Sequence, residues 1–260
     1  ERAKWFISEL RHFSFLFHEQ NPFEIISEID PRTGENVFRV LVKESVPPQV
    51  SAIVGDTVHN LRSALDYLIG ELALDNGEAP SENFGFPISR RAHRHVQSRR
   101  AQKLKGISPR AERLILWLKA NERVNAMLWK LNWLDLIDKH NSILLTAAST
   151  VQVSAKVGVP GLFVGPDQTL RIAGPGIDGI RLMVDAGTPA KFKRVFPLKD
   201  NDEVYRSPAG FVEEVSGTID IAIGGEEIPE GAPAVELLTQ FVDLVERILG
   251  IFERQVLQKR

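Results

Sequence analysis

The chain of 260 residues contains no cysteine. This absence excludes disulfide bonds, thiolate zinc sites and cysteine nucleophiles, and it makes the chain indifferent to the redox state of its compartment. Long apolar runs are missing too, because a stretch such as NSILLTAAST is far too short to cross a bilayer. No charged segment leads into an apolar one followed by a small-residue cleavage site. We therefore expect no signal peptide, no membrane partner and, by default, a cytoplasmic setting.

Complete catalytic and cofactor signatures are also absent. The sequence has no G-x-S-x-G, no P-loop and no G-x-G-x-x-G behind a strand. The glycines of GPGIDG lie in a β-rich tract without a following helix, so a phosphate cradle is not predicted. Histidines and carboxylates do occur together, but no H-E-x-x-H or comparable ligand spacing is found. We expect neither a metal nor another cofactor.

The charge of the chain is unevenly distributed. The formal net charge is only -2, with 43% hydrophobic and 25% charged residues, as in an ordinary soluble protein. Residues 89–113, however, hold nine basic side chains and one acidic one, Glu112. Such a stretch on an otherwise acidic chain favours an anionic partner, RNA for example, bound through residues 90–105. The candidate contact residues are Arg90, Arg91, Arg94, Arg99, Arg100 and Lys103.

The first part of the chain is typical of helices interrupted by one hairpin. Apolar residues spaced by three and four predict a helix over residues 1–20, which ends before Asn21-Pro22. Two β-leaning runs, FEIISEID and NVFRVLVK, are joined by PRTGE, which supplies the proline and glycine of a turn. We therefore predict a β-hairpin over residues 22–43.

Three further helices are predicted by capping signals and apolar periodicity. Pro47-Pro48 opens a long helix that continues to the DNG sequence, and Gly55 in its middle indicates a close crossing by another helix. Ser108 followed by proline begins a shorter helix. Another long helix is expected over residues 124–147, with enough apolar surface to pair with the first as the core of a bundle.

After Thr150 the composition changes to short β-rich runs separated by glycine and proline. These runs predict antiparallel strands, and PAVELLTQFVDLVERILGIFERQVL predicts a closing helix. Because strands and helices come in blocks, the expected fold class is α+β. The predicted organisation is a helical bundle over 1–150 with the hairpin 22–43 inserted, a β-rich unit over 151–228, and a helix over 231–258 that packs back on the bundle.

The predicted helix GDTVHNLRSALDYL carries polar groups whose burial costs desolvation free energy, and these groups lie beside its apolar stripe. At 100° per residue, Asp56, His59 and Asp66 share one side of the helix, with Arg62 beside them. The apolar residues from Leu61 to Leu72 lie on a separate face. A buried helix that keeps such groups must give each of them an opposite partner.

A second polar stretch, DLIDKHNS, can supply these partners. Asn132, Asp135 and Lys139 are spaced along one face of the later helix, with Asp138 and His140 close by. If the two helices pack antiparallel, His59 and Arg62 face Asp135, Asp138 or His140. The whole functional interpretation depends on this crossing.

Two interpretations of the crossing stay open. In the first, the polar groups form a structural network that fixes helix register, and the chain is a binding module for a protein or a small anion. In the second, it is a metal-independent ribonuclease in which histidine moves protons and arginine holds the phosphate while an RNA 2′-hydroxyl attacks. The candidate catalytic residues are His59, Arg62, Asp66, Asp138 and His140.

The two polar stretches together resemble a widespread group of uncharacterised bacterial proteins with a GD-x-x-HNLR-x-ALD helix and a later DKH element. A basic residue often follows DKH in that group, whereas this chain has Asn141. More loosely, long helices with polar Arg and His are similar to HEPN-type bundles, whose R-x4-6-H motif implies metal-independent RNase activity. The literal match, Arg90 with His95, lies in a segment so polar that it favours a solvated basic surface. A homodimer also stays open.

Overall fold

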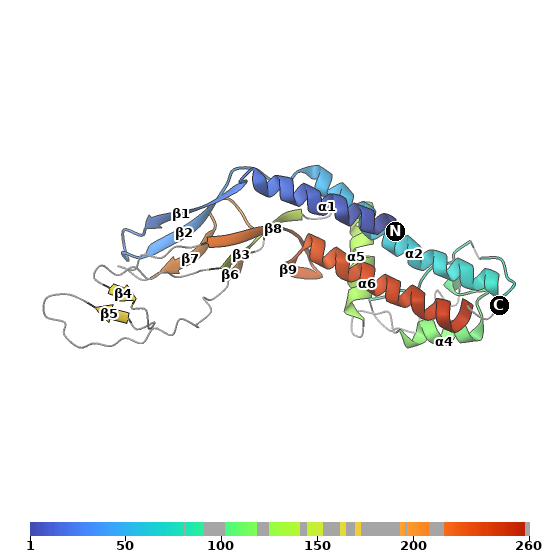
Figure 1. Ribbon diagram of the computed structural model, residues 1–260. Coiled ribbons are helices and arrows are strands. Elements are labelled where there is room, and N and C mark those ends of the chain that lie inside the picture. The colour runs from blue at the N-terminus through green and yellow to red at the C-terminus, as the bar shows by residue number, and fades with distance from the viewer. Residues whose placement is uncertain are drawn as a thin grey trace. The chain divides into compact units, whose positions relative to one another are not determined.

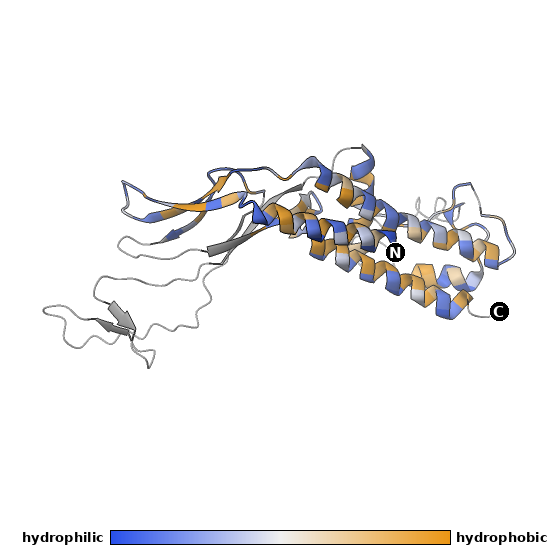
Figure 2. Ribbon diagram, turned by 45° about the horizontal axis from the view of Figure 1, so that its top comes forward, coloured by the Kyte–Doolittle hydropathy of each residue, from blue (hydrophilic) through white to orange (hydrophobic). Residues whose placement is uncertain are grey.

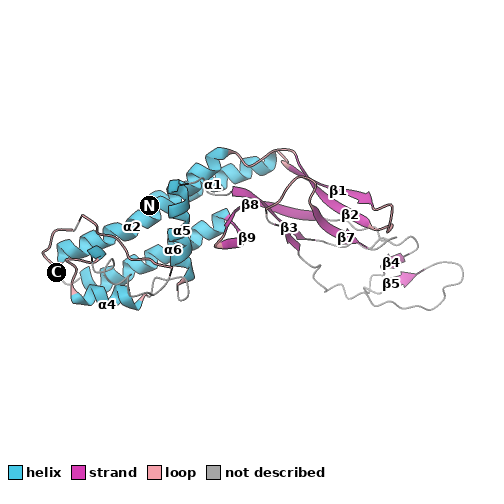
Figure 3. Cartoon of the chain, turned by 180° about the vertical axis from the view of Figure 1, so that it is seen from behind, coloured by secondary structure: helices cyan, strands magenta, loops and turns pink. Residues whose placement is uncertain are grey.

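The computed structural model describes residues 1–80, 82–90, 102–118, 125–140, 145–152, 162–164, 170–172, 193–195, 197–207 and 216–257 (Figure 1). The chain divides into two compact units. Unit 1 comprises residues 1–17, 46–145 and 222–260, and unit 2 comprises residues 18–45 and 146–221. The described helices belong almost wholly to unit 1 and most of the described strands to unit 2 (Figure 3).

The helices of unit 1 lie close to the positions that the apolar periodicity predicts. Helix α2 begins at the second proline of the Pro-Pro pair, and α4 begins behind Ser108, whose hydroxyl accepts a hydrogen bond from the backbone N–H of Ala111. The bounds are α1 Arg2–Glu19, α2 Pro48–Asp75, α4 Pro109–Trp117, α5 Ala126–His140 and α6 Ala234–Phe252, continued by the π-helix η1 Glu253–Leu257.

The core of unit 1 lies where α2 packs against both α5 and α6. Each helix turns one apolar stripe inward, which Figure 2 shows as orange bands beside blue ones. Helix α1 runs antiparallel along α6. This orientation follows from two contacts, Lys4 with Glu246 and Arg11 with Thr239. The closing helix therefore packs back on the bundle, as predicted. Fully buried members of this core are Leu10, Leu65, Ile69, Leu72, Leu128, Leu131, Leu134, Phe241 and Phe252.

The later long helix is shorter than the sequence predicts. We expected a helix over residues 124–147, but α5 ends at His140 and strand β3 begins at Leu145. The prediction was wrong because the run from Ile143 to Ala148 is apolar except for Thr146, and short runs of this kind fit a buried strand as well as a helix.

Unit 2 is built from antiparallel strands. Strands β1 Phe23–Ile29 and β2 Asn36–Val42 form the predicted hairpin, and β2 also pairs with β7 Glu203–Ser207. A second sheet has the order β6-β3-β8-β9, in which β8 Ser216–Gly225 begins in unit 2 and ends in unit 1. The other bounds are β3 Leu145–Gln152, β4 Leu162–Val164, β5 Leu170–Ile172, β6 Lys193–Val195 and β9 Ile228–Pro233.

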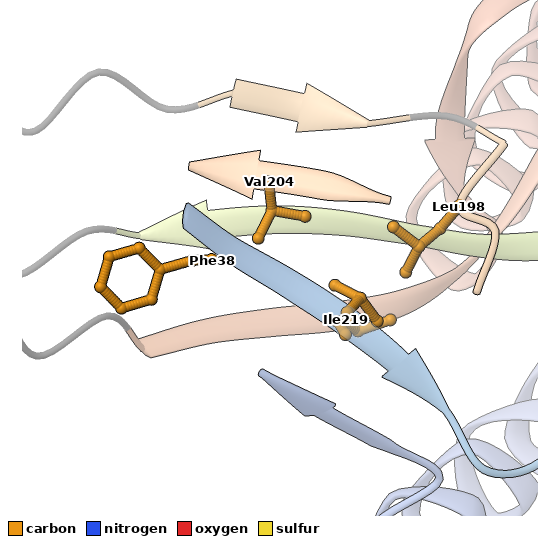
Figure 4. Packing of buried hydrophobic residues seen from close by; sticks show 5 residues of the cluster. Phe38, Leu198, Val204 and Ile219 are labelled. Carbon is orange, nitrogen blue, oxygen red and sulfur yellow. The ribbon is translucent and has the colours of Figure 1, made fainter. Parts of the chain in front are cut away.

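A separate apolar cluster stabilises unit 2. Buried side chains from β2, β7, β8 and the segment before β7 pack together, as Figure 4 shows for four of them. Its buried members are Phe38, Val40, Leu198, Val204 and Ile219. Tyr205 and residues of β1 cover the edge of this cluster, so the hairpin is bound to strands more than 150 residues later in the chain.

The α+β fold with an N-terminal hairpin and a C-terminal helix is as predicted. The grouping of its parts differs from the prediction in one respect. The hairpin 22–43 was placed with the helices of residues 1–150, but it pairs with β7 and belongs to unit 2. Its apolar face needs a sheet partner, which only the later strands supply. One of the β-rich runs expected after Thr150, IRLMVD at residues 180–185, lies outside the described residues.

Candidate functional site

Arg62 is the most completely engaged polar side chain between α2 and α5. Its side chain is only 8% exposed. Nε donates to Oδ1 of Asn132 at 3.2 Å, Nη1 to Oδ1 of Asp66 at 2.5 Å, and Nη2 to the backbone carbonyl of Phe86 at 2.9 Å. Every nitrogen of the guanidinium therefore has an acceptor within the protein, as a buried cation requires.

Arg62 and Asp66 together hold the backbone of Phe86. Oδ1 of Asp66 accepts the Phe86 N–H at 2.7 Å, while Arg62 donates to the carbonyl of the same residue. The Phe86 side chain is fully buried. An i,i+4 ion pair on α2 therefore satisfies both backbone polar groups of one buried residue and fixes this segment to the helix.

His59 is paired with a buried carboxylate. Nδ1 of His59 lies 3.1 Å from Oδ1 of Asp135, and the other carboxylate oxygen accepts from Nζ of Lys139 at 2.6 Å. The side chain of Asp135 is only 5% exposed, whereas that of His59 is 55% exposed. The residue numbers of these contacts rise along α5 as they fall along α2: Asn132 contacts Arg62, and Asp135 contacts His59. Helices α2 and α5 therefore cross in the predicted antiparallel sense.

Asp138 lies against Gly55 one turn further along the crossing. A side chain at Gly55 would overlap the carboxyl group of Asp138, so the mid-helix glycine marks a close approach of α5, as predicted. Partial burial raises the pKa of the Asp138 carboxyl, and the nearby charges of Asp135 and Asp56 raise it further. His59 and Lys139 act on this pKa in the opposite direction.

The basic stretch is described only at its two ends. Arg90 lies 3.4 Å from a carboxylate oxygen of Glu226 and 3.4 Å from one of Glu227. Lys103 is half-buried, and burial together with the charge of Arg62 lowers the pKa of its amine. The remaining candidate contact residues, Arg91, Arg94, Arg99 and Arg100, lie outside the described residues, as does His95.

The crossing thus unites most of the residues that the sequence singles out. His59, Arg62 and Asp66 of α2 meet Asn132, Asp135 and Asp138 of α5 or the Phe86 backbone. His140 is the last residue of α5, and its side chain lies outside the part of the chain that is described.

One partner at the crossing was not foreseen. Phe86 contributes its backbone from the segment between α2 and α4, and backbone groups carry no residue-specific signal. Asp135 was expected to face His59 but was not among the candidate catalytic residues. Its i,i+4 spacing to Lys139 is the signal that could have indicated its burial with a partner.

Searches for similar proteins find no matching protein-family model, no matching curated protein and no matching solved structure. Across the described ranges, no cluster of three or more histidine and acidic side chains is arranged to hold a metal ion. The described helices include none that is long and apolar enough to cross a bilayer. Any function must therefore be argued from the side chains of this chain.

Proposed function

We propose that the chain is a binding module for an anionic partner, with a polar network between α2 and α5 that locks its helical unit. The lock consists of Arg62, Asp66 and Asn132 with the Phe86 backbone. The anionic partner is supported by the basic stretch 90–105, whose central part is known only from sequence. RNA is one such partner, and a protein with an acidic surface is another.

The single observation that carries this proposal is that each of the three guanidinium nitrogens of Arg62 donates to an acceptor within the protein. A guanidinium that binds a ligand phosphate presents two parallel N–H groups to it. Here all three nitrogens donate to protein acceptors, and the side chain is almost fully buried. The residue that most resembled a phosphate ligand in the sequence thus has a structural role.

The ribonuclease alternative is favoured by one specific observation, the contact of His59 with Asp135. A carboxylate that orients an imidazole is a recurring element of acid–base catalysis. The alternative also needs a cation to hold the scissile phosphate, and Arg62 is already occupied. Incubation of a mixed RNA pool with the wild-type protein in EDTA tests it directly. Cleavage that disappears in His59→Ala, with the fold intact, would establish the nuclease.

The lock is tested by Arg62→Met, which keeps the length of the side chain and removes its donors. Breaking a buried charge network costs about 3–5 kcal/mol, so we expect this loss in the free energy of unfolding from urea denaturation. Arg110→Met is the matched control, since Arg110 is an exposed residue of α4. An unfolding free energy of Arg62→Met equal to that of the control would overturn the lock.

Binding is tested with heparin as a polyanion probe. The triple variant Arg94→Gln, Arg99→Gln and Arg100→Gln should bind more weakly than wild type, and its affinity should depend less steeply on salt. A variant with Arg110→Gln and Arg113→Gln removes exposed charge from α4 and serves as the control. Equal affinity of wild type and the triple variant would exclude residues 90–105 as the contact.

A further inference from the structure

The tautomer of His59 follows from its contact with Asp135. An ionised carboxylate can only accept hydrogen bonds, so the Nδ1 that lies 3.1 Å from it must carry the proton. In the neutral imidazole the lone pair then lies on Nε2. More than half of the His59 side chain is exposed, and Nε2 has no partner among the described residues. The ring therefore offers an oriented base to solvent.

The surroundings of this base are negatively charged. Three carboxylates lie at this end of the crossing. Asp135 contacts the ring of His59, and Asp138 interacts electrostatically with His59, Asp135 and Asp56. One cation, Lys139, is bonded to Asp135. Arg62 lies further along α2, and each of its three guanidinium nitrogens donates to an internal acceptor. The carboxylates at this end of the crossing favour a neutral or cationic ligand at the ring over a phosphate or a carboxylate.

We propose that His59 and Asp135 form a proton-transfer site for a substrate that carries no negative charge. The lone pair of Nε2 takes a proton from the substrate or from a water molecule, and the electron pair of the broken bond stays on the donor atom. Asp135 stabilises the imidazolium that results. Nε2 then returns the proton to the product or to the leaving atom, so the site regenerates itself. This site goes beyond the proposed binding function and does not depend on the lock around Arg62.

Asp135 is a positioning residue in this scheme. It is buried, it fixes the orientation of the ring, and Lys139 holds its second oxygen. Its negative charge stabilises the imidazolium that forms on the ring, without touching the substrate. Replacing that charge while keeping the hydrogen bond should therefore slow the proton transfer.

The site is tested with 4-nitrophenyl acetate, a neutral ester that reports on exposed imidazole bases. Nε2 takes a proton from a water molecule as the water oxygen attacks the acetyl carbon, and the ester C–O bond breaks with its electron pair leaving on 4-nitrophenolate. Acetic acid is released, and the imidazolium returns its proton to solvent. Acid–base groups contribute about 10²–10⁴ in rate, so His59→Gln should retain less than about a tenth of the wild-type rate. His12→Gln is the control, because His12 is exposed on α1 and has no carboxylate partner among the described residues.

A charge series of substrates tests the substrate class. The three probes are 4-nitrophenyl esters of a trimethylammonium acid, of acetic acid and of glutaric acid, which are cationic, neutral and anionic. We expect kcat/KM, divided for each ester by its rate with free imidazole, to fall in that order and the three ratios to converge in about 1 M salt, where the Debye length is about 3 Å. A fastest reaction with the anionic ester, or cleavage of RNA by His59, would overturn the proposal.

The role of Asp135 is tested by the separate kcat and KM values of Asp135→Asn with the acetate ester. The expected result is a lower kcat than in wild type with KM little changed, because Asp135 acts on the ring and does not touch the substrate. Circular dichroism melting of each variant shows that the fold is intact at the assay temperature. A rate of His59→Gln equal to that of His12→Gln, in folded proteins, would show that the exposed imidazole is not a functional base. Failure of the lock would appear only in the Arg62 denaturation experiment, so the two proposals can fail separately.

Discussion

The carboxyl group of Asp138 occupies the space that a side chain at Gly55 would need. The contact brings the carboxyl group of an exposed residue of α5 against the backbone of α2. Alanine is favoured over glycine in a helix by about 1 kcal/mol, so a glycine kept here has a packing reason.

Gly55→Ala should therefore lower the free energy of unfolding despite its higher helix propensity. Overpacking costs about 1–3 kcal/mol, whereas the gain in helix propensity from glycine to alanine is about 1 kcal/mol. The cost therefore exceeds the gain over most of its range. Gly70→Ala in the same helix is the matched control, because its added carbon would meet Phe84 at an ordinary 3.5 Å. We expect the control to gain about 1 kcal/mol. The double variant Gly55→Ala, Asp138→Ala should recover stability relative to Gly55→Ala in urea denaturation, and no recovery would contradict the contact.

Asp138→Asn should change how stability depends on pH. The folded-state pKa of Asp138 is raised, mainly by burial, so ionisation of this carboxyl destabilises the fold. The penalty is complete above the folded pKa and disappears as pH falls below the unfolded value. Asp138→Asn should therefore be more stable than wild type at pH 7, with the difference closing towards pH 4. Melting curves across this range check the prediction, and a constant difference between the two proteins would refute it.

Gly225→Ala should be strongly destabilising in unit 1. Gly225 has a φ of 147°, and an added carbon there would overlap the indole of Trp133. Gly77, with a φ of 80° and nothing within 4 Å of an added carbon, is the control for backbone strain alone. Strain of this kind costs about 1–2 kcal/mol, and overlap in a packed core adds about 1–3 kcal/mol for Gly225→Ala. Equal losses for the two variants in denaturant unfolding would show that Trp133 does not restrict this position.

Arg206→Gln should loosen the turn of the β-hairpin in unit 2. Arg206 on β7 bonds to Asp30 and Glu35, which flank the hairpin turn, and to Glu203. The hydrogen bond from Arg206 lowers the pKa of Glu35. The pKa of Asp30 is lowered most by the hydrogen bond from the Arg32 backbone N–H and next by that from Arg206. A lowered folded pKa stabilises the fold above the unfolded value, and this stabilisation is lost as pH falls through the folded one.

Faster amide hydrogen exchange over residues 30–36 is therefore expected in Arg206→Gln at pH 7. The difference from wild type should shrink in acid, where both carboxylates become protonated. Arg32→Gln is the comparison, because the Arg32 side chain is far more exposed than that of Arg206. Exchange that is unchanged in Arg206→Gln would show that these ion pairs do not hold the turn.

The local signals in the sequence predicted much of the fold. Proline at the start of α2, serine before α4 and the spacing of apolar residues gave helices within a few residues of those observed. Two strands were missed. Strand β7 is a short segment rich in charged residues, and β9 contains two prolines and a glycine, so both depend on a neighbouring strand for their conformation.

The candidate site was predictable only in part, because local signals place residues on a helix face but do not specify their distant partners. Periodicity placed His59 and Arg62 on one polar side of α2, with Asp135, Asp138 or His140 as expected partners. The contact of His59 with Asp135 confirms this for His59, whereas Arg62 bonds to Asn132, Asp66 and the Phe86 carbonyl instead. Periodicity could not show that Arg62 would bind the Phe86 carbonyl while His59 stays exposed. Arg62 is buried and His59 is exposed, and this difference in exposure separates a structural group from one that can react with a substrate.

The sequence by itself determined the helix starts, the apolar stripes and the polar face of α2, because these depend on residues within a few turns of one another. Only the tertiary structure decided which partner each charge received, how deeply each was buried and where the hairpin packed. These properties depend on groups far apart in the chain, such as the Phe86 backbone beside Asp66 and β7 beside β2, and no local pattern encodes those distances.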